Sequence, residues 1–105
     1  MVLRKLKQEA EVALRHLEVL DLVEKNQPIG IFKLAEIINL PKHKVRYSLR
    51  VLEQSGIIEP TQHGAMIRED ADEVFVKLKE EIKEIKKLMD EIEKKIDDIC
   101  SRSSV

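Results

Sequence analysis

Residues 29–58, which read IGIFKLAEIINLPKHKVRYSLRVLEQSGII, decide the fold. Within this stretch, residues 32–38 place Leu34, Ala35 and Ile38 on one face at helical spacing, which predicts a two-turn helix. Asn39-Leu40-Pro41 ends that helix, because proline lacks a backbone N–H and restricts the residue before it. The sequence therefore predicts a short helix followed by a tight turn.

A longer helix is predicted from Lys42 to Ser55, with Val45, Leu49 and Leu52 turned toward the core. Gly56 follows and can adopt the left-handed backbone that ends a helix. Two brief apolar runs, residues 57–60 and 65–67, then flank a polar loop that contains a glycine. This pattern predicts a small β-hairpin directly after the helix.

Upstream of this stretch, residues 2–25 are predicted to form one helix, because apolar residues recur three and four positions apart. The first half of the helix offers only a narrow apolar seam that includes Leu3 and Leu6, so residues 1–10 are expected to form an arm. The second half carries additional apolar residues and is expected to face a core. We therefore divide the chain into an N-terminal helix (1–25) and a central domain (26–68).

Downstream, residues 69–100 are predicted to form a long helix that opens with an acidic cluster, which a helix N-terminus favours. Its apolar residues alternate four and three positions apart, as in a coiled coil. They are Ala71, Phe75, Leu78, Ile82, Ile85, Met89, Ile92, Ile96 and Ile99. A helix of about 30 residues is about 45 Å long, so most of this stripe needs a partner helix. Residues 101–105 lack the period and are expected to form a disordered tail.

The central stretch resembles the winged helix-turn-helix domains of bacterial and archaeal transcription regulators. The most specific part of the resemblance is the run from Leu49 to Ile58, LRVLEQSGII, in which Leu49, Leu52, Glu53 and Gly56 hold the matching positions. The resemblance implies a mainly α fold with a small β-hairpin, and double-stranded DNA binding as a dimer. It also implies that the helix from Lys42 lies in the major groove.

The residues of that helix agree with a DNA interface. With the apolar trio turned inward, six side chains that can donate hydrogen bonds occupy the other faces: Lys42, His43, Lys44, Arg46, Tyr47 and Arg50. No acidic residue occurs from Lys42 through Leu52, and residues 42–68 carry five basic against two acidic side chains, a net charge of +3. A solvated basic helix face is the alternative. The hairpin loop is short for a wing, and Gln62 and His63 are its candidates for a phosphate contact.

The long helix predicts self-association, and the alternative is an overlong helix that packs on its own domain. Isoleucine at both kinds of core position does not favour a simple two-stranded zipper, so we expect the first and last helices of two protomers to form a bundle. The predicted dimerisation residues are Leu3, Leu6, Leu78, Ile82, Ile85, Met89, Ile92, Ile96 and Ile99. Such a homodimer would present its two reading helices to half-sites about 34 Å apart.

The composition narrows the remaining classes of function. With 105 residues, a net charge of −1 and a single cysteine, Cys100, the chain predicts one small cytoplasmic domain with an extension and no disulfide framework. The three histidines are scattered, so neither an enzyme site nor a cofactor is expected. A winged-helix module that docks a protein is the alternative function, a metal-sensing regulator is a weaker one, and any small-molecule effector is unknown.

Overall fold

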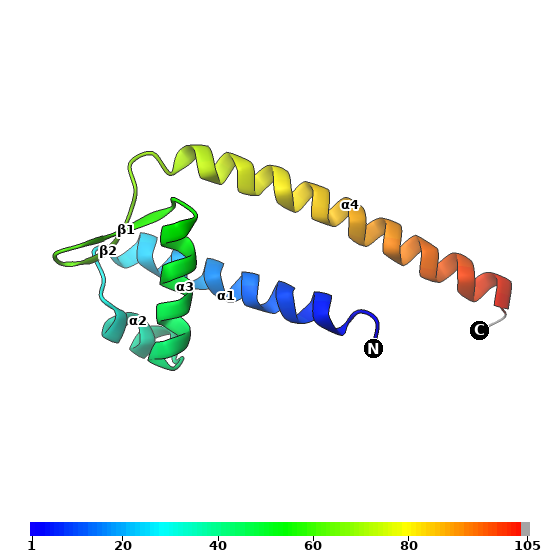
Figure 1. Cartoon of the computed structure of the whole chain (residues 1–105), viewed down its shortest axis with the longest axis horizontal. Helices are drawn as coiled ribbons and strands as arrows, with labels where there is room; N and C mark the ends of the chain where they lie inside the picture. Colours follow the sequence, from blue (N-terminus) through cyan, green and yellow to red (C-terminus); the bar gives the residue numbers. More distant parts are fainter. Residues whose placement is uncertain (104–105) are drawn as a thin grey trace. The chain divides into compact units, whose positions relative to one another are not determined.

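The computed structural model describes residues 1–103 and contains four helices and one hairpin (Figure 1). In chain order the elements are α1 (Arg4–Asn26), α2 (Ile31–Ile38), α3 (Lys42–Gln54), β1 (Ile58–Thr61), β2 (Gly64–Ile67) and α4 (Asp72–Ser103). The chain divides into two compact units, Met1–Asp72 and Glu73–Val105. The predicted fold, mainly α with a small β-hairpin, is confirmed.

The core of the first unit is built by apolar side chains from α1, α2, α3 and the hairpin. Its members are Val19, Leu20, Val23, Ile29, Leu34, Ala35, Val45, Leu52, Ile57, Ile58, Ala65 and Ala71. On α3 the expected inner residues Val45 and Leu52 are buried, whereas Leu49 is only half-buried. Ser48, which the apolar pattern does not single out, is fully buried between them. The inner face of α3 is therefore turned slightly toward Ser48.

Both helices of the helix-turn-helix end in a left-handed residue. Asn39 has φ 58° after α2, and Gly56 has φ 80° after α3, as the sequence predicts for the glycine. Beyond Gly56, the Ile57 N–H donates to the Leu52 carbonyl at 3.1 Å. Pro41 precedes α3 and supplies no side-chain cap. Asn39 and Pro41 thus bound the short turn from α2 into α3, and Gly56 ends α3 before the hairpin.

The hairpin pairs Ile58 with Ile67 and Thr61 with Gly64 in antiparallel register. Ile29 adds an isolated bridge to it, donating to the Ala65 carbonyl at 3.2 Å and accepting from the Ala65 N–H at 2.8 Å. This approach requires a glycine at position 64, where φ is 126° and a Cβ would lie 2.5 Å from the Ile29 carbonyl carbon. The hairpin is thereby tied to the segment before α2.

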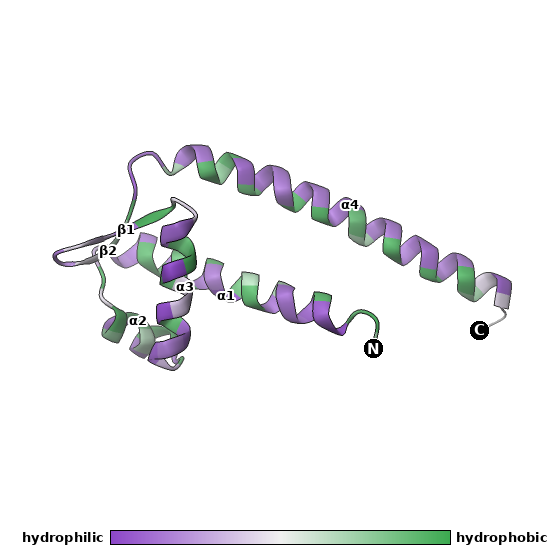
Figure 2. Ribbon diagram, viewed as in Figure 1, coloured by the Kyte–Doolittle hydropathy of each residue, from purple (hydrophilic) through white to green (hydrophobic). Residues whose placement is uncertain are grey.

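Helix α4 buries none of its residues, and hydrophobic positions recur along its length (Figure 2). Two expectations about its ends need correction. Ala71 precedes the helix and is buried, with its N–H bonded to the Arg68 carbonyl, so it belongs to the first unit. The helix also continues to Ser103, so residues 101–103 are helical, while 104–105 lie outside the described residues. Across residues 1–103, every helix is too short or too charged to span a membrane.

Candidate nucleic-acid interface

The exposed face of α3 is set by what its inner face buries. Val45, Ser48 and Leu52 are three and four positions apart and point into the core, so the side chains between them face outward. All six predicted DNA-binding residues of this helix are exposed: Lys42, His43, Lys44, Arg46, Tyr47 and Arg50. The helix therefore presents a continuous row of donors to solvent.

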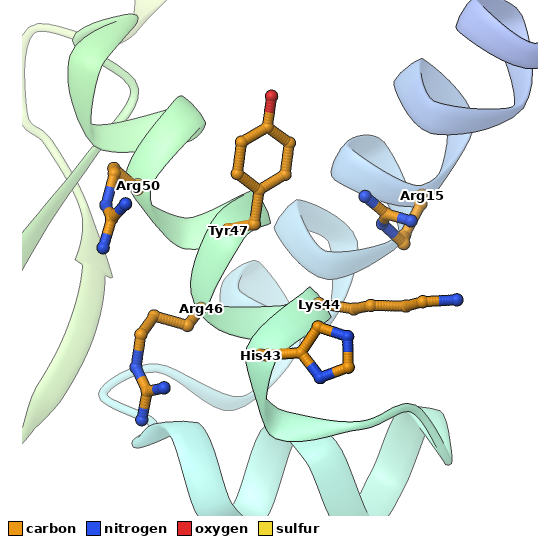
Figure 3. Close-up of a pocket in the computed structure, with 6 residues that line it drawn as sticks. All are labelled: Arg15, His43, Lys44, Arg46, Tyr47 and Arg50. Atoms are coloured by element: carbon orange, nitrogen blue, oxygen red, sulfur yellow. The ribbon is translucent and has the colours of Figure 1, made fainter.

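Five of these side chains line one open groove of about 520 Å³, together with Arg15 of α1 (Figure 3). The lining residues are Arg15, His43, Lys44, Arg46, Tyr47 and Arg50. Four of the six carry permanent positive charge and none is acidic, so the groove concentrates a positive potential. Arg46 and Arg50 lie on one side of α3 in this view, while Lys44 and Arg15 lie on the other.

Lys42 is not among the residues that line this groove. Its ammonium nitrogen lies 4.0 Å from the centre of the Phe32 ring, a cation–π contact between the first turns of α3 and α2. The Phe32 side chain is 69% exposed, so this pair remains at the surface. The structure thus separates Lys42 from the other five candidates on α3.

His16 of α1 connects α1 to the back of the groove. Its Nδ1 lies 2.8 Å from the Ser48 hydroxyl oxygen, and its ring centre lies 5.6 Å from that of Tyr47. Burial, and secondarily the charge of Arg15, lower the pKa of His16 from its ordinary value of 6.5. The imidazole is therefore mainly neutral at pH 7 and holds α3 to α1 beside the groove.

The hairpin loop is polar but not basic. Gln62 and His63 are exposed at its tip, where the Thr61 hydroxyl accepts from the His63 N–H and donates to the Gly64 carbonyl. At its base, Arg68 donates two hydrogen bonds to Asp70, at 2.9 and 3.2 Å, which lowers the pKa of the Asp70 carboxyl. Neither Gln62 nor His63 lines the groove, so the structure does not bring them together with the α3 candidates.

Sequence reasoning missed Arg15, His16 and Ser48. A signal was available for the first two, because Arg15 and His16 lie one helical turn before Val19 and Leu20 and so share their faces of α1. Val19 and Leu20 are buried, so the same faces of α1 point into the core, where α1 packs against α3. The sequence does not say which residue of α3 they would meet.

The predicted dimerisation residues have much apolar surface in contact with solvent. Leu3 and Leu6 are 43% and 39% exposed on the N-terminal part of α1. On α4 the exposed members are Ile82, Ile85, Ile96 and Ile99, and the half-buried ones are Leu78, Met89 and Ile92. Cys100 is a half-buried free thiol.

Two comparisons with known proteins bear on this geometry. No curated protein matches the chain. Residues 14–59 match the family model described as winged helix-turn-helix DNA-binding. The matched range runs from the second half of α1 to the start of β1 and contains every residue that lines the groove. The resemblance seen in the sequence is thus confirmed for residues 14–59, which match a winged helix-turn-helix domain of the DNA-binding type.

Proposed function

We propose that this chain is a homodimeric transcription regulator that binds double-stranded DNA with α3 in the major groove of each half-site. The DNA-binding type of the domain over residues 14–59 supports a duplex partner. The observation that carries the proposal is the acid-free groove along α3, lined by four permanent cations. Such a surface attracts the phosphates of a duplex and supplies donors to its bases.

The exposed row on α3 suits this role because the major groove, roughly 12 Å wide, admits one α-helix. Arg46 and Arg50 lie one turn apart, and arginine can donate two hydrogen bonds to a guanine edge. Tyr47 can donate its hydroxyl to a phosphate oxygen. Gln62 and His63 of the hairpin loop, and Lys42 beside Phe32, are proposed to contact phosphates at the edges of the interface.

The proposed dimer rests on the apolar stripe of α4. Ile82 and Ile85 are 49% and 47% exposed on a helix of 32 residues that buries none of its side chains. Exposed apolar stripes of this length mark association surfaces. Pairing through α4 and the N-terminal part of α1 would place two α3 helices on half-sites about one DNA turn apart, about 34 Å.

The proposal is tested by fluorescence anisotropy with labelled genomic duplexes at two salt concentrations. The single variants Arg46→Ala and Arg50→Ala should each weaken binding about tenfold, because each removes a contact to a base or a phosphate. If the removed contact is to a phosphate, the slope of log affinity against log salt concentration should also become shallower by about one. Arg102→Ala, which removes the same charge from α4, is the matched control and should bind like the unmodified chain. Unchanged affinity for both groove variants would contradict the proposal.

A protein-docking module is the second candidate, and the exposed stripe of α4 is the observation in its favour. In that function the stripe would receive a helix of another protein rather than a second copy of this chain. The same titration separates the two, because a docking module should retain no duplex at low or moderate salt. The acid-free groove has no role in the docking function, and for this reason we favour DNA binding.

A further inference from the structure

Arg15 is the one residue of the groove that α3 does not supply. It comes from the middle of α1, 29 positions before Lys44, and lines the groove together with Lys44 and Tyr47. In Figure 3, Arg15 and Lys44 lie on the same side of α3. Two positively charged side chains from different helices therefore border one end of the groove. Like charges repel each other, so such a pair is stabilised when an anion joins it.

The Arg15 side chain is partly buried, and one of its donors lacks a partner. Its Nε is fully buried and has no hydrogen-bond partner within residues 1–103. Buried donors in proteins are nearly always paired, so an unpaired guanidinium N–H needs an explanation. Because this Nε is buried, an external ligand would meet the terminal nitrogens of the guanidinium, on the part of Arg15 that lines the groove.

Carboxylates are available to Arg15 on its own helix, yet it does not pair with them. Glu11 and Glu18 lie four positions before and three after it, the usual spacing of helical ion pairs. Both border a second hollow, which Arg15 and Lys44 also line. Within residues 1–103, however, the ion pairs closer than 4.0 Å are Lys25 with Asp21 and Arg68 with Asp70. The guanidinium of Arg15 is thus left available to an external anion.

We infer that Arg15 and Lys44 together hold one DNA phosphate on the α1 side of α3. This inference rests on the proposed function and deepens it, because it divides the groove into two parts. The Arg15–Lys44 site binds the sugar–phosphate strand and sets the depth and direction of α3. Arg46 and Arg50, on the opposite side, are left to contact base edges or the other strand. The ligand is a phosphodiester within a duplex, and the site reads no sequence.

The position of His16 fits this division. It follows Arg15 in the chain, and it is tied to the Ser48 hydroxyl at 2.8 Å. This link runs from α1 to α3, so the two cations are carried by helices whose spacing is fixed beside them. A rigid pair of donors holds a phosphate with less loss of side-chain freedom than two independent surface lysines do.

The test is a set of salt titrations with Arg15→Gln, using one duplex selected for tight binding and one of scrambled sequence. The loss should be about three- to tenfold at moderate salt, equal on both duplexes, with the salt slope reduced by about one. Arg15→Lys should retain the slope, because a lysine still neutralises a phosphate. Arg4→Gln removes the same charge from the exposed start of the same helix and should change neither value.

Several outcomes would overturn the inference. If the unmodified chain binds both duplexes and Arg15→Gln retains its slope, the Arg15–Lys44 site is wrong while the proposed function stands. A loss confined to the selected duplex would make Arg15 a base contact instead. If the unmodified chain binds neither duplex, the inference and the proposed function fail together.

A second measurement separates a DNA phosphate from a small free anion. Inorganic phosphate is titrated into the protein while the Arg15 Nε–H signal is followed by NMR. Weak, unsaturated shifts up to tens of millimolar are expected, because a single ion lacks the neighbouring phosphates of a duplex. Saturation at low millimolar phosphate, with loss of duplex binding, would assign the site to a free anion and overturn the inference.

Discussion

Replacing Ile85 by aspartate is expected to split the proposed homodimer. Ile85 lies in the middle of the α4 stripe and is 47% exposed, with Ile82 49% exposed one turn before it. About half of the isoleucine surface is therefore still available for burial against a partner. The substitution places a carboxylate at the same point of both protomers in a two-fold dimer.

The size of the effect follows from that exposure. Full burial of an isoleucine contributes about 1.5–3 kcal/mol, so the available half contributes about 1 kcal/mol in each protomer. An unpaired carboxylate within an apolar seam costs several kcal/mol more. A total of at least about 4 kcal/mol for the dimer corresponds to a rise in its dissociation constant of about a thousandfold. A dimer with a micromolar dissociation constant would become monomeric at any practical concentration.

The assay is sedimentation equilibrium over a range of protein concentrations, followed by anisotropy with a duplex that holds two half-sites. Ile85→Asp should sediment as a monomer and bind this duplex weakly, and Ile92→Asp should do the same. Lys87→Asp is the matched control, because it places an aspartate half a turn away on the polar face of α4 and should leave the dimer intact. An intact dimer for both isoleucine variants, or a monomeric unmodified chain, would refute the reasoning.

Two further predictions concern the stability of the first unit. Gly64→Ala should lower the free energy of unfolding by at least about 2 kcal/mol in urea melts, because φ is 126° and the new Cβ would lie 2.5 Å from the Ile29 carbonyl carbon; Gly30→Ala, which meets nothing within 4 Å, should not. The second prediction concerns His16, whose pKa is lowered in the folded state. The contribution of His16 to the free energy of unfolding should be constant above pH 6.5, the ordinary value of its pKa. It should fall as the pH is lowered through 6.5, because the unfolded chain then binds the proton first. Between pH 7.5 and 5.5, the urea midpoint should fall less for His16→Gln than for the unmodified chain. An equal fall for His16→Gln would contradict the assignment to His16. So would a similarly reduced fall for His63→Gln, the control in the exposed loop.

Much of the local structure could be predicted because it is encoded by residues close together in the chain. Residues three and four positions apart define a helix face. Apolar residues recur at this spacing in α1, α2, α3 and α4, so the sequence predicts all four helices. The end of α2 was predicted from Pro41 and the end of α3 from Gly56, whose backbone is left-handed as expected. The left-handed backbone of Asn39 was seen only in the structure. The donor-rich face of α3 was predictable for the same reason. Once the apolar positions are assigned to the core, the remaining residues of the helix must face solvent.

The ends of the elements were less predictable. Ala71 fits the apolar period of α4 yet is buried in the first unit, because a small side chain can satisfy a helical pattern and a core position equally well. Residues 101–103 continue α4 although they carry no apolar period, since a helix can continue through polar residues by its backbone hydrogen bonds alone. The spacing of apolar residues predicts which side chains are buried, but it does not predict where the backbone hydrogen bonds of a helix end.

The sequence by itself determined the helices, their faces, the turns between them and the acid-free row on α3. Only the tertiary structure decided that Arg15 joins that row, that His16 meets Ser48 32 positions away, and that Ile29 pairs with Ala65. These pairings join residues that are distant in the chain, and they depend on the angle and spacing at which the helices and the hairpin pack. Local preferences fix each element, but only the shared core brings their side chains together.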